Sequence, residues 1–257
     1  MTNPATGVLG ASGRFFTFGL DTARAVFRRP FQVRELIQQA WFISSVSILP
    51  AALVSIPFGA VIALQLGSLV RQLGAQSFTD AASVLAVVRE SGPIVTALII
   101  AGAGGSAICA DLGSRKIREE IDAMLVLGID PVQRLVVPRV IASMLVAVLL
   151  NGLVSVVGVA GGYVFNVLVQ GGTPGSYVAS FQALGQLADL VAGEFKALVF
   201  GAAAALVASY KGLNADGGPK GVGDAVNQSV VITFMLLFAL NFIITAVYFQ
   251  VVPQKGT

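Results

Sequence analysis

Five long stretches that carry few or no charged side chains dominate this sequence and restrict how it can fold. They cover residues 36–70, 91–110, 140–188, 190–210 and 225–254. A helix that crosses a bilayer needs roughly 20 apolar residues, and only the stretch 190–210, which contains Glu194 and Lys196, fails to meet this outright. Charged residues are 11% of the chain, against about 25% in soluble domains. The sequence therefore predicts an all-α polytopic membrane protein with about five transmembrane helices.

The third stretch, 140–188, is longer than one transmembrane helix requires. Turn-forming residues gather at 171–175, Gly-Gly-Thr-Pro-Gly, so we expect one tilted helix followed by a loop. Two spans joined by a tight hairpin near Gly161-Gly162 are the alternative.

The distribution of basic residues predicts the orientation of the chain in the membrane. With five spans and a cytoplasmic N-terminus, twelve of the sixteen Lys and Arg residues fall on the cytoplasmic side, whereas the external segment 171–188 has none. Because cytoplasmic loops of membrane proteins are enriched in Lys and Arg, we expect a multi-pass protein of the plasma (inner) membrane. Its C-terminus would then lie outside.

The segment 14–35 has the pattern of a basic amphipathic helix that lies on the membrane surface. Phe15, Phe18, Ala25 and Val26 alternate with basic residues, which favours an interfacial position. The basic residues are Arg14, Arg24, Arg28 and Arg29. Pro30 is expected to end or bend this helix, and a disordered basic tail is the alternative. The segment lacks the sustained apolar core and the small-residue cleavage site of a signal peptide.

Several classes of function lack the residues they would need. The chain has no His, which excludes His-based acid–base chemistry and His metal sites. It has no P-loop motif for ATP and no Gly-x-Ser-x-Gly nucleophile motif. The net charge of +3 follows from the membrane topology, so nucleic acid is not an expected partner. These observations favour a transport or binding role, with no cofactor or metal on this chain and no enzymatic activity of its own.

A charged loop, 113–131, separates the second and third apolar stretches. Ile117, Ile121, Met124 and Leu125 fall on one side at helical spacing, while the charged residues point away. The charged residues are Arg115, Arg118, Glu119 and Asp122. This pattern predicts a short amphipathic helix on the cytoplasmic side. Gly128 is expected to end this helix, and Asp130-Pro131 to form the turn that follows it. It indicates either a docking element for a partner or a solvated loop helix without one.

Several motifs along the chain, taken in order, carry a resemblance to a known family. They are Arg89-Glu-Ser-Gly-Pro93, Ala101-Gly-Ala-Gly-Gly-Ser-Ala-Ile-Cys-Ala-Asp-Leu-Gly113, Glu119-Glu-Ile-Asp-Ala-Met124 with Gly128-Ile-Asp-Pro131, Val137-Pro-Arg-Val-Ile-Ala142, and Gly217-Gly-Pro-Lys-Gly-Val-Gly-Asp-Ala-Val-Asn227. Together they resemble the MlaE/YrbE permeases, the transmembrane subunits of ABC lipid transporters that work with Mce proteins. The resemblance extends over residues 14–252, within what we expect to be a single permease domain, 1–257.

The resemblance implies a mechanism and a set of partners. The loop between the second and third spans would be a coupling helix that docks on a cytoplasmic ABC ATPase dimer, and ATP and Mg would bind to that dimer. Carried over by position, the coupling residues here are Arg118, Glu119, Glu120, Asp122, Ala123 and Gly128. The substrate would be a phospholipid, a fatty acid, a mycolate-type lipid or a sterol.

Three positions depart from the common pattern of the family. Ala103 stands where an Arg is frequent, Asp111 where a Glu is frequent and Arg115 where a Met is frequent. These changes resemble the actinobacterial YrbE branch, which implies a heterodimer with a paralogous permease rather than a homodimer, and lipid import. They weaken any substrate contact inferred from the missing Arg.

Four ionisable residues are candidates for the lipid pathway, because charges inside a membrane are costly and often functional. Arg89 and Glu90 open the second span, and Glu194 and Lys196 lie within the fourth. Being two positions apart, Glu194 and Lys196 face different ways on a helix. The alternatives are that Lys196 snorkels to the headgroups and that Arg89 and Glu90 form an ion pair or an interface anchor.

Small and amide residues within the spans suggest close helix packing. Gly102, Gly105, Gly158 and Gly162 allow helices to approach closely, either within the subunit or at a subunit interface. Asn151, Asn166 and Asn241 bridge helices or line the pathway, and bridging is the simpler interpretation.

The prediction is therefore the permease subunit of an ATP-driven lipid transporter. Its first rival is an ion-coupled secondary transporter or channel without an ATPase, for which an inverted repeat or ionisable residues near the midplane would be needed. The second rival is a membrane enzyme that acts on lipid, for which the sequence offers no intramembrane carboxylate pair or nucleophile.

Overall fold

The computed structural model describes residues 4–28, 32–72, 79–169, 175, 177 and 186–252, and these residues form helices and no strand. The chain starts with α1 (Pro4–Val26) and α2 (Val33–Gln72). Then follow α3 (Thr79–Ala86), η2 (Val87–Ser91), α4 (Gly92–Ile99), η3 (Ile100–Gly105), α5 (Ser106–Ile117), α6 (Glu120–Val126), η4 (Val132–Val136), α7 (Val137–Val169), α9 (Leu187–Leu213) and α10 (Gly218–Val251).

Five of the helical segments are long and apolar enough to cross a membrane. They are Val33–Leu69, Ala82–Ile117, Val132–Leu168, Leu187–Leu213 and Gly218–Val251. This confirms the prediction of an all-α polytopic protein with five spans. The third span runs as one helix through Gly161 and Gly162, so the hairpin alternative is wrong. The turn expected at 171–175 lies outside the described residues except for Gly175.

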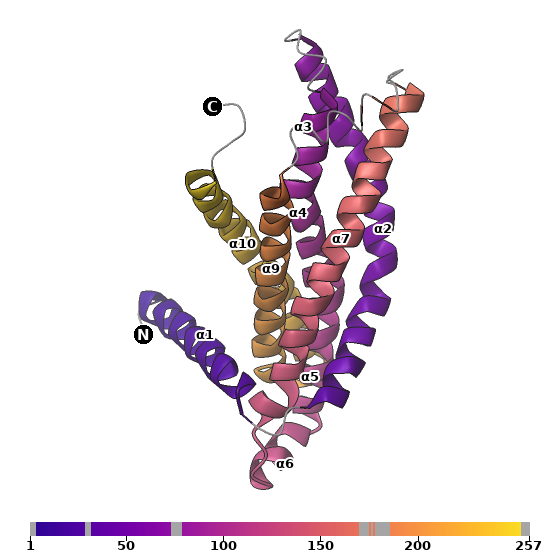
Figure 1. Cartoon of the computed structure of the whole chain (residues 1–257). Coiled ribbons are helices and arrows are strands. Elements are labelled where there is room, and N and C mark those ends of the chain that lie inside the picture. Colours follow the sequence, from indigo (N-terminus) through magenta and orange to yellow (C-terminus); the bar gives the residue numbers. More distant parts are fainter. Residues whose placement is uncertain are drawn as a thin grey trace.

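The spans form one bundle, in which α7 packs along α2 on one side and along α9 on the other. Figure 1 shows α6 at the foot of the bundle and α3 at the opposite end. We call these the α6 end and the α3 end. The start of α2 and the connection between α9 and α10 lie at the α6 end, and α9 begins at the α3 end (Figure 1).

The second span is longer than its uncharged core, 91–110, because the helix continues through charged residues at both ends. At the α3 end it widens into the π-helical turn η2, which carries Arg89 and Glu90. Pro93 explains this widening, since it lacks the N–H that would bond the Arg89 carbonyl in a regular α-helix. The wide turn places two charged side chains against neighbouring spans.

Glycines allow the helices to cross closely. A Cβ atom on Gly158 would lie 3.7 Å from the Ser55 carbonyl oxygen of α2, and one on Gly162 would lie 3.5 Å from the Gly59 carbonyl oxygen. On Gly105 it would lie 3.8 Å from the Ala208 side chain of α9. These three glycines therefore line contacts within the subunit. Gly102 differs, because no described atom lies within 4 Å of its Cβ position.

A close contact that tests this packing is made by Gly201 in α9, whose Cβ position lies 2.7 Å from the Ser143 carbonyl oxygen and 2.8 Å from the Ala147 side chain. We expect Gly201→Val to lower the free energy of unfolding by about 1–3 kcal/mol, because the added atoms force α7 and α9 apart. Gly102→Val is the matched control, with a change under about 1 kcal/mol. Equal unfolding curves in detergent for both variants would contradict this packing.

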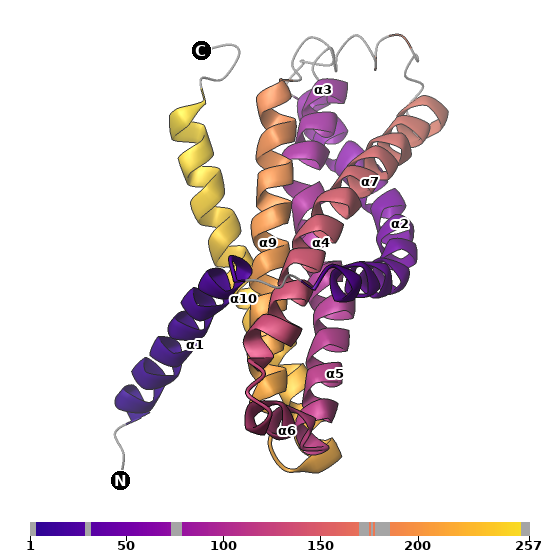
Figure 2. The ribbon, with the colours of Figure 1, turned by 60° about the horizontal axis from the view of Figure 1, so that its bottom comes forward.

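The N-terminal helix differs in its bounds from the predicted segment 14–35. It begins earlier, at Pro4, and ends at Val26, while residues 33–35 already belong to α2. Figure 2 shows α1 angled away from the bundle. Its apolar side meets the α6 end, where the rings of Phe15 and Phe18 lie 5.5 and 5.4 Å from the ring of Tyr210. Pro30 lies outside the described residues.

Candidate functional site

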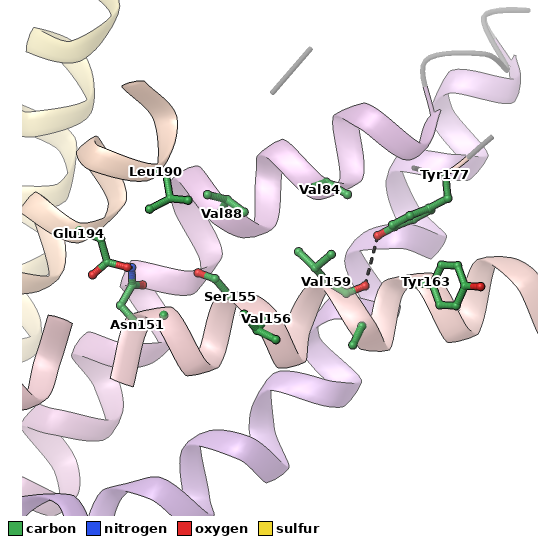
Figure 3. A pocket seen from close by; sticks show the side chains of 12 residues that line it. Val84, Val88, Asn151, Ser155, Val156, Val159, Tyr163, Tyr177, Leu190 and Glu194 are labelled. Carbon is green, nitrogen blue, oxygen red and sulfur yellow. Dashed lines mark hydrogen bonds between the residues drawn. The ribbon is translucent and has the colours of Figure 1, made fainter. Parts of the chain in front are cut away.

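An apolar cavity of about 500 Å³ lies between the second, third and fourth spans, toward the α3 end. This volume is within the range of ligand pockets, about 300–1,000 Å³. Figure 3 shows its lining side chains along α7, with α3 and η2 opposite and α9 at one side. The lining residues are Val84, Val88, Asn151, Gly152, Ser155, Val156, Val159, Ala160, Tyr163, Tyr177, Leu190 and Glu194. None of them is a Lys or an Arg.

One end of the cavity is polar. Asn151 of α7 donates a hydrogen bond from Nδ2 to Glu194 Oε1 of α9, at 3.1 Å (Figure 3). Asn151 is buried, with 2% of its surface exposed. Glu194 lies seven residues after Leu187, where α9 begins, a depth of about 10 Å at 1.5 Å per residue. This end, which we call the Asn151–Glu194 end, is the deeper one.

Aromatic residues line the other end of the cavity. The hydroxyl of Tyr177 donates to the Val159 carbonyl oxygen at 3.2 Å, and its ring packs edge-on against Tyr163 with centroids 5.4 Å apart. Both rings line the cavity (Figure 3). A ligand in the cavity would therefore meet polar atoms mainly at its two ends and hydrocarbon between them.

Lys196 does not reach this cavity. Its side chain is 1% exposed, and its amine donates to Glu90 Oε1 at 2.9 Å and to the Arg89 carbonyl oxygen at 3.0 Å. Glu90 also accepts hydrogen bonds from Asn241 and Thr245 of α10 at 3.4 and 3.3 Å. The pair thus joins the second, fourth and fifth spans, and Lys196 does not snorkel toward the membrane surface.

A second ionic cluster lies next to this pair. The guanidinium of Arg89 contacts Asp189 of α9 at 2.5 Å and lies 5.2 Å from the centroid of the Tyr248 ring. The Tyr248 hydroxyl donates to the same Asp189 carboxylate. Asp189 also caps α9, since it accepts the backbone N–H of Gln186 at 3.1 Å.

Of the four residues predicted for the lipid pathway, only Glu194 lines the cavity, while Arg89, Glu90 and Lys196 join spans. Sequence reasoning missed Asp189 and Tyr248, although Gln186 and Asp189 have the spacing of a capping box. Asn151, which we expect either to bridge helices or to line the pathway, does both, since it bridges α7 to α9 and also lines the cavity. In the described residues, no group of His, Cys, Asp and Glu side chains is placed to hold a metal ion.

A second candidate surface lies at the α6 end. Helix α6 is a separate helix that starts after Glu119, which has a left-handed backbone (φ 60°). It ends at Val126, and the chain turns at Gly128 (φ 72°), where the Gly128 and Ile129 N–H groups bond the Leu125 and Met124 carbonyl oxygens. This is the Schellman arrangement that favours glycine. Asp130 then accepts the Val132 N–H at 2.9 Å and starts the third span.

The predicted amphipathic helix was too long, and its apolar side was partly wrong. Residues 115–117 end the second span instead, because the chain turns at Glu119. Ile121 is buried, but Leu125 points away from the bundle with 58% of its surface exposed. Val126 and Leu127 are also exposed, at 88% and 74%. The α6 surface, residues 117–129, therefore presents apolar side chains beside acidic ones.

Ion pairs connect the α6 surface to the bundle. Glu120 contacts Arg118 at 2.9 Å and Arg115 at 3.7 Å, and Arg115 contacts Asp111 at 3.2 Å. Asp111 in turn pairs with Arg139 of α7. Arg139 is fully buried and also lies 3.7 Å from Glu35 of α2, so the first three spans meet at one guanidinium.

A polytopic helical bundle that encloses an apolar cavity between its spans has the architecture of a membrane permease. Comparison with known proteins identifies the family. Residues 36–247 match the family described as Permease MlaE, and the chain belongs to this family. The resemblance stated from its motifs is thereby confirmed.

Individual relatives match over most of their length. A probable ABC transporter permease protein of Rickettsia bellii is 33% identical over 240 residues, 93% of this chain and 92% of the relative. One of Synechocystis is 38% identical over 192 residues, 75% of this chain and 73% of the relative. The intermembrane phospholipid transport system permease protein MlaE of Haemophilus influenzae is 29% identical over 242 residues, 94% and 92% of the two chains.

Proposed function

We propose that this chain is the transmembrane permease subunit of an ATP-driven lipid transporter in the plasma (inner) membrane. The observation that carries the proposal is the cavity of about 500 Å³ with nearly uniform apolar walls, in a member of the MlaE permease family. Hydrocarbon walls suit acyl or polycyclic tails. The name of the Haemophilus relative, which refers to phospholipid transport, supports a lipid as the substrate.

The α6 surface is the proposed docking site for a cytoplasmic ABC ATPase dimer. Exposed Val126 and Leu127 next to Glu119, Glu120 and Asp122 offer an apolar patch with an acidic rim, a composition typical of protein interfaces. Arg118, Ala123 and Gly128 complete the proposed contact segment. With this docking site, the proposal has the α6 end and the N-terminus in the cytoplasm, the C-terminus outside, and ATP and Mg bound to the ATPase.

The ionic chain from Glu120 through Arg115 and Asp111 to Arg139 is the proposed route of transmission. Movement of α6 by the ATPase would shift α5 and, through the buried Arg139, the starts of α2 and α7. α7 continues to the cavity and carries Asn151. A push at the α6 end can therefore change the width of the cavity by rigid displacement of one helix.

The remaining partners follow from the family resemblance. We propose extracytoplasmic Mce proteins as the donors of lipid and a paralogous YrbE-type permease as the second subunit, with import as the direction. The departures at Ala103, Asp111 and Arg115 support the heterodimer. Asp111 and Arg115 lie in the ionic chain, so the three departures do not all concern substrate contact.

Purification of the full chain from its native membrane tests the proposed function. Mass spectrometry of the complex is expected to find an ABC ATPase in defined proportion, together with lipid above the amount that an unrelated polytopic protein retains. Addition of lipid should stimulate ATP hydrolysis. Transport driven by an ion gradient in liposomes that contain this chain and no ATPase would overturn the proposal and favour the secondary transporter.

A further inference from the structure

The two residues that line the deep end of the cavity each have one oxygen atom that accepts no hydrogen bond from the described residues. They are Asn151 Oδ1 and Glu194 Oε2, and both are buried. The one bond between the two side chains uses Asn151 Nδ2 and Glu194 Oε1, so both remaining atoms are acceptors. A buried acceptor without a donor is unfavourable, and the Asn151–Glu194 end therefore lacks a donor that a ligand can supply.

The described residues that line this end offer no cation to neutralise an acidic ligand. The described lining residues include no Lys or Arg, and the sequence of the connection 170–185 contains none. The nearest basic side chains in the fourth and second spans are already in ion pairs, Lys196 with Glu90 and Arg89 with Asp189. A phosphate or carboxylate head at this position would face the Glu194 carboxylate without compensation.

We propose that the cavity binds an amphiphile whose head donates hydrogen bonds and carries no negative charge, a hydroxyl or an ammonium group. The head lies at the Asn151–Glu194 end, and the hydrocarbon lies along the walls formed by Val84, Val156 and Val159. This inference rests on the proposed lipid-permease function and adds to it the chemical class of the head.

The geometry permits this contact with a small local change. Both residues line the cavity, and the terminal torsion of a glutamate has a broad range of low-energy angles, so a partial rotation of the Glu194 carboxylate can turn Oε2 toward the cavity. Both residues lie within long helices, α7 and α9. The site is therefore preformed apart from one side-chain rotation.

Photo-crosslinking of the full chain in nanodiscs tests the proposal with three probes that share one alkyl chain and one diazirine. The heads are a primary alcohol, a primary amine and a phosphate. The measurement is the labelled fraction of peptides from α7 that contain Val156 and Val159. The alcohol and amine probes are expected to label these peptides at least about tenfold more than the phosphate probe, since one charge-assisted hydrogen bond corresponds to about tenfold or more in affinity.

Two substitutions at Glu194 separate charge from hydrogen bonding. Glu194→Gln keeps the shape and an acceptor, so labelling by the amine probe should fall about tenfold while labelling by the alcohol probe changes little. Glu194→Leu removes the acceptor and should lower labelling by both probes. Asp224→Asn, the same carboxylate-to-amide change on an exposed residue of α10, is the control and should leave labelling unchanged.

Phosphate labelling equal to alcohol labelling, full amine labelling of Glu194→Gln, or no labelling by any probe would each overturn the inference. The amount of ATPase that co-purifies in the same preparation shows whether such a result contradicts only the proposed class of head or also the proposed permease function. If the ATPase and its stimulation by lipid persist, only the class of head is wrong. If both are missing as well, the permease function itself is wrong.

Discussion

Replacing Glu119 and Glu120 together by Lys is expected to reduce the amount of ATPase that co-purifies with this chain by about tenfold or more. The two carboxylates lie on the exposed α6 surface, and reversal of their charges in a complementary interface costs several kcal/mol, where each 1.4 kcal/mol is tenfold. Lipid-stimulated ATP hydrolysis should fall in parallel, while the amount of chain in the membrane stays the same. Normal recovery of the ATPase would rule out α6 as the coupling helix.

The double substitution should change the stability of α6 itself only slightly, so that loss of the ATPase can be attributed to the interface. Glu119 makes no ion pair with the described residues, and the contacts of Glu120 with Arg118 and Arg115 are partly exposed, worth about 0–1 kcal/mol each. The matched control is Asp216→Lys, a charge reversal at an exposed residue of the connection between α9 and α10, also at the α6 end. It should retain the ATPase. An equal loss in the control would show that charge anywhere on this end, rather than the α6 surface, determines binding.

Replacing Lys196 by Met is expected to destabilise the bundle by about 3 kcal/mol. The change leaves the Glu90 carboxylate without its cation and removes the Lys196 bond to the Arg89 carbonyl oxygen, and loss of one partner of a buried ion pair costs about 3–5 kcal/mol. The lower part of this range applies because the Glu90 side chain is 34% exposed and because Asn241 and Thr245 still donate to it. Unfolding monitored in detergent against temperature or SDS measures the effect.

A double variant distinguishes this structural role from a direct contact of Lys196 with lipid. Lys196→Met with Glu90→Gln removes both charges, so it should recover most of the stability that the single change loses, as replacement of whole buried pairs often does. If Lys196 instead contacted lipid, the single change would lower lipid recovery with an unchanged unfolding midpoint, and Glu90→Gln would restore nothing.

The sequence predicted the spans well because length and lack of charge determine them almost alone. It placed the start of the second span at 91, nine residues after the observed Ala82, because it treated Arg89 and Glu90 as the edge of the membrane. Their partners, Asp189 and Lys196, lie about a hundred residues away in the chain, and no local pattern reveals such pairs. A charged residue at the end of an apolar stretch is thus a poor marker of where a transmembrane helix ends when an oppositely charged residue on another helix pairs with it.

The candidate site was only partly predictable for the same reason. Glu194 was recognised because a carboxylate among apolar residues is conspicuous. Which neighbouring helix or cavity its side chain faces depends on the orientation of α9 about its own axis relative to α7. That orientation is fixed by contacts such as Gly201 against Ser143. The break between α5 and α6 was missed because the left-handed residue there is Glu119, not a glycine, and its sequence gives no turn signal.

The ion pair between Lys196 and Glu90 has a consequence for how this protein is made. Among the described residues Glu90 pairs with one cation, which belongs to the fourth span, and a charge without a partner inside the membrane is costly. While the chain is being synthesised, the second span therefore enters the bilayer with a carboxylate whose cation arrives only with the fourth. The earlier helices should remain beside the insertion machinery until α9 emerges, and membrane integration should proceed in a group rather than helix by helix.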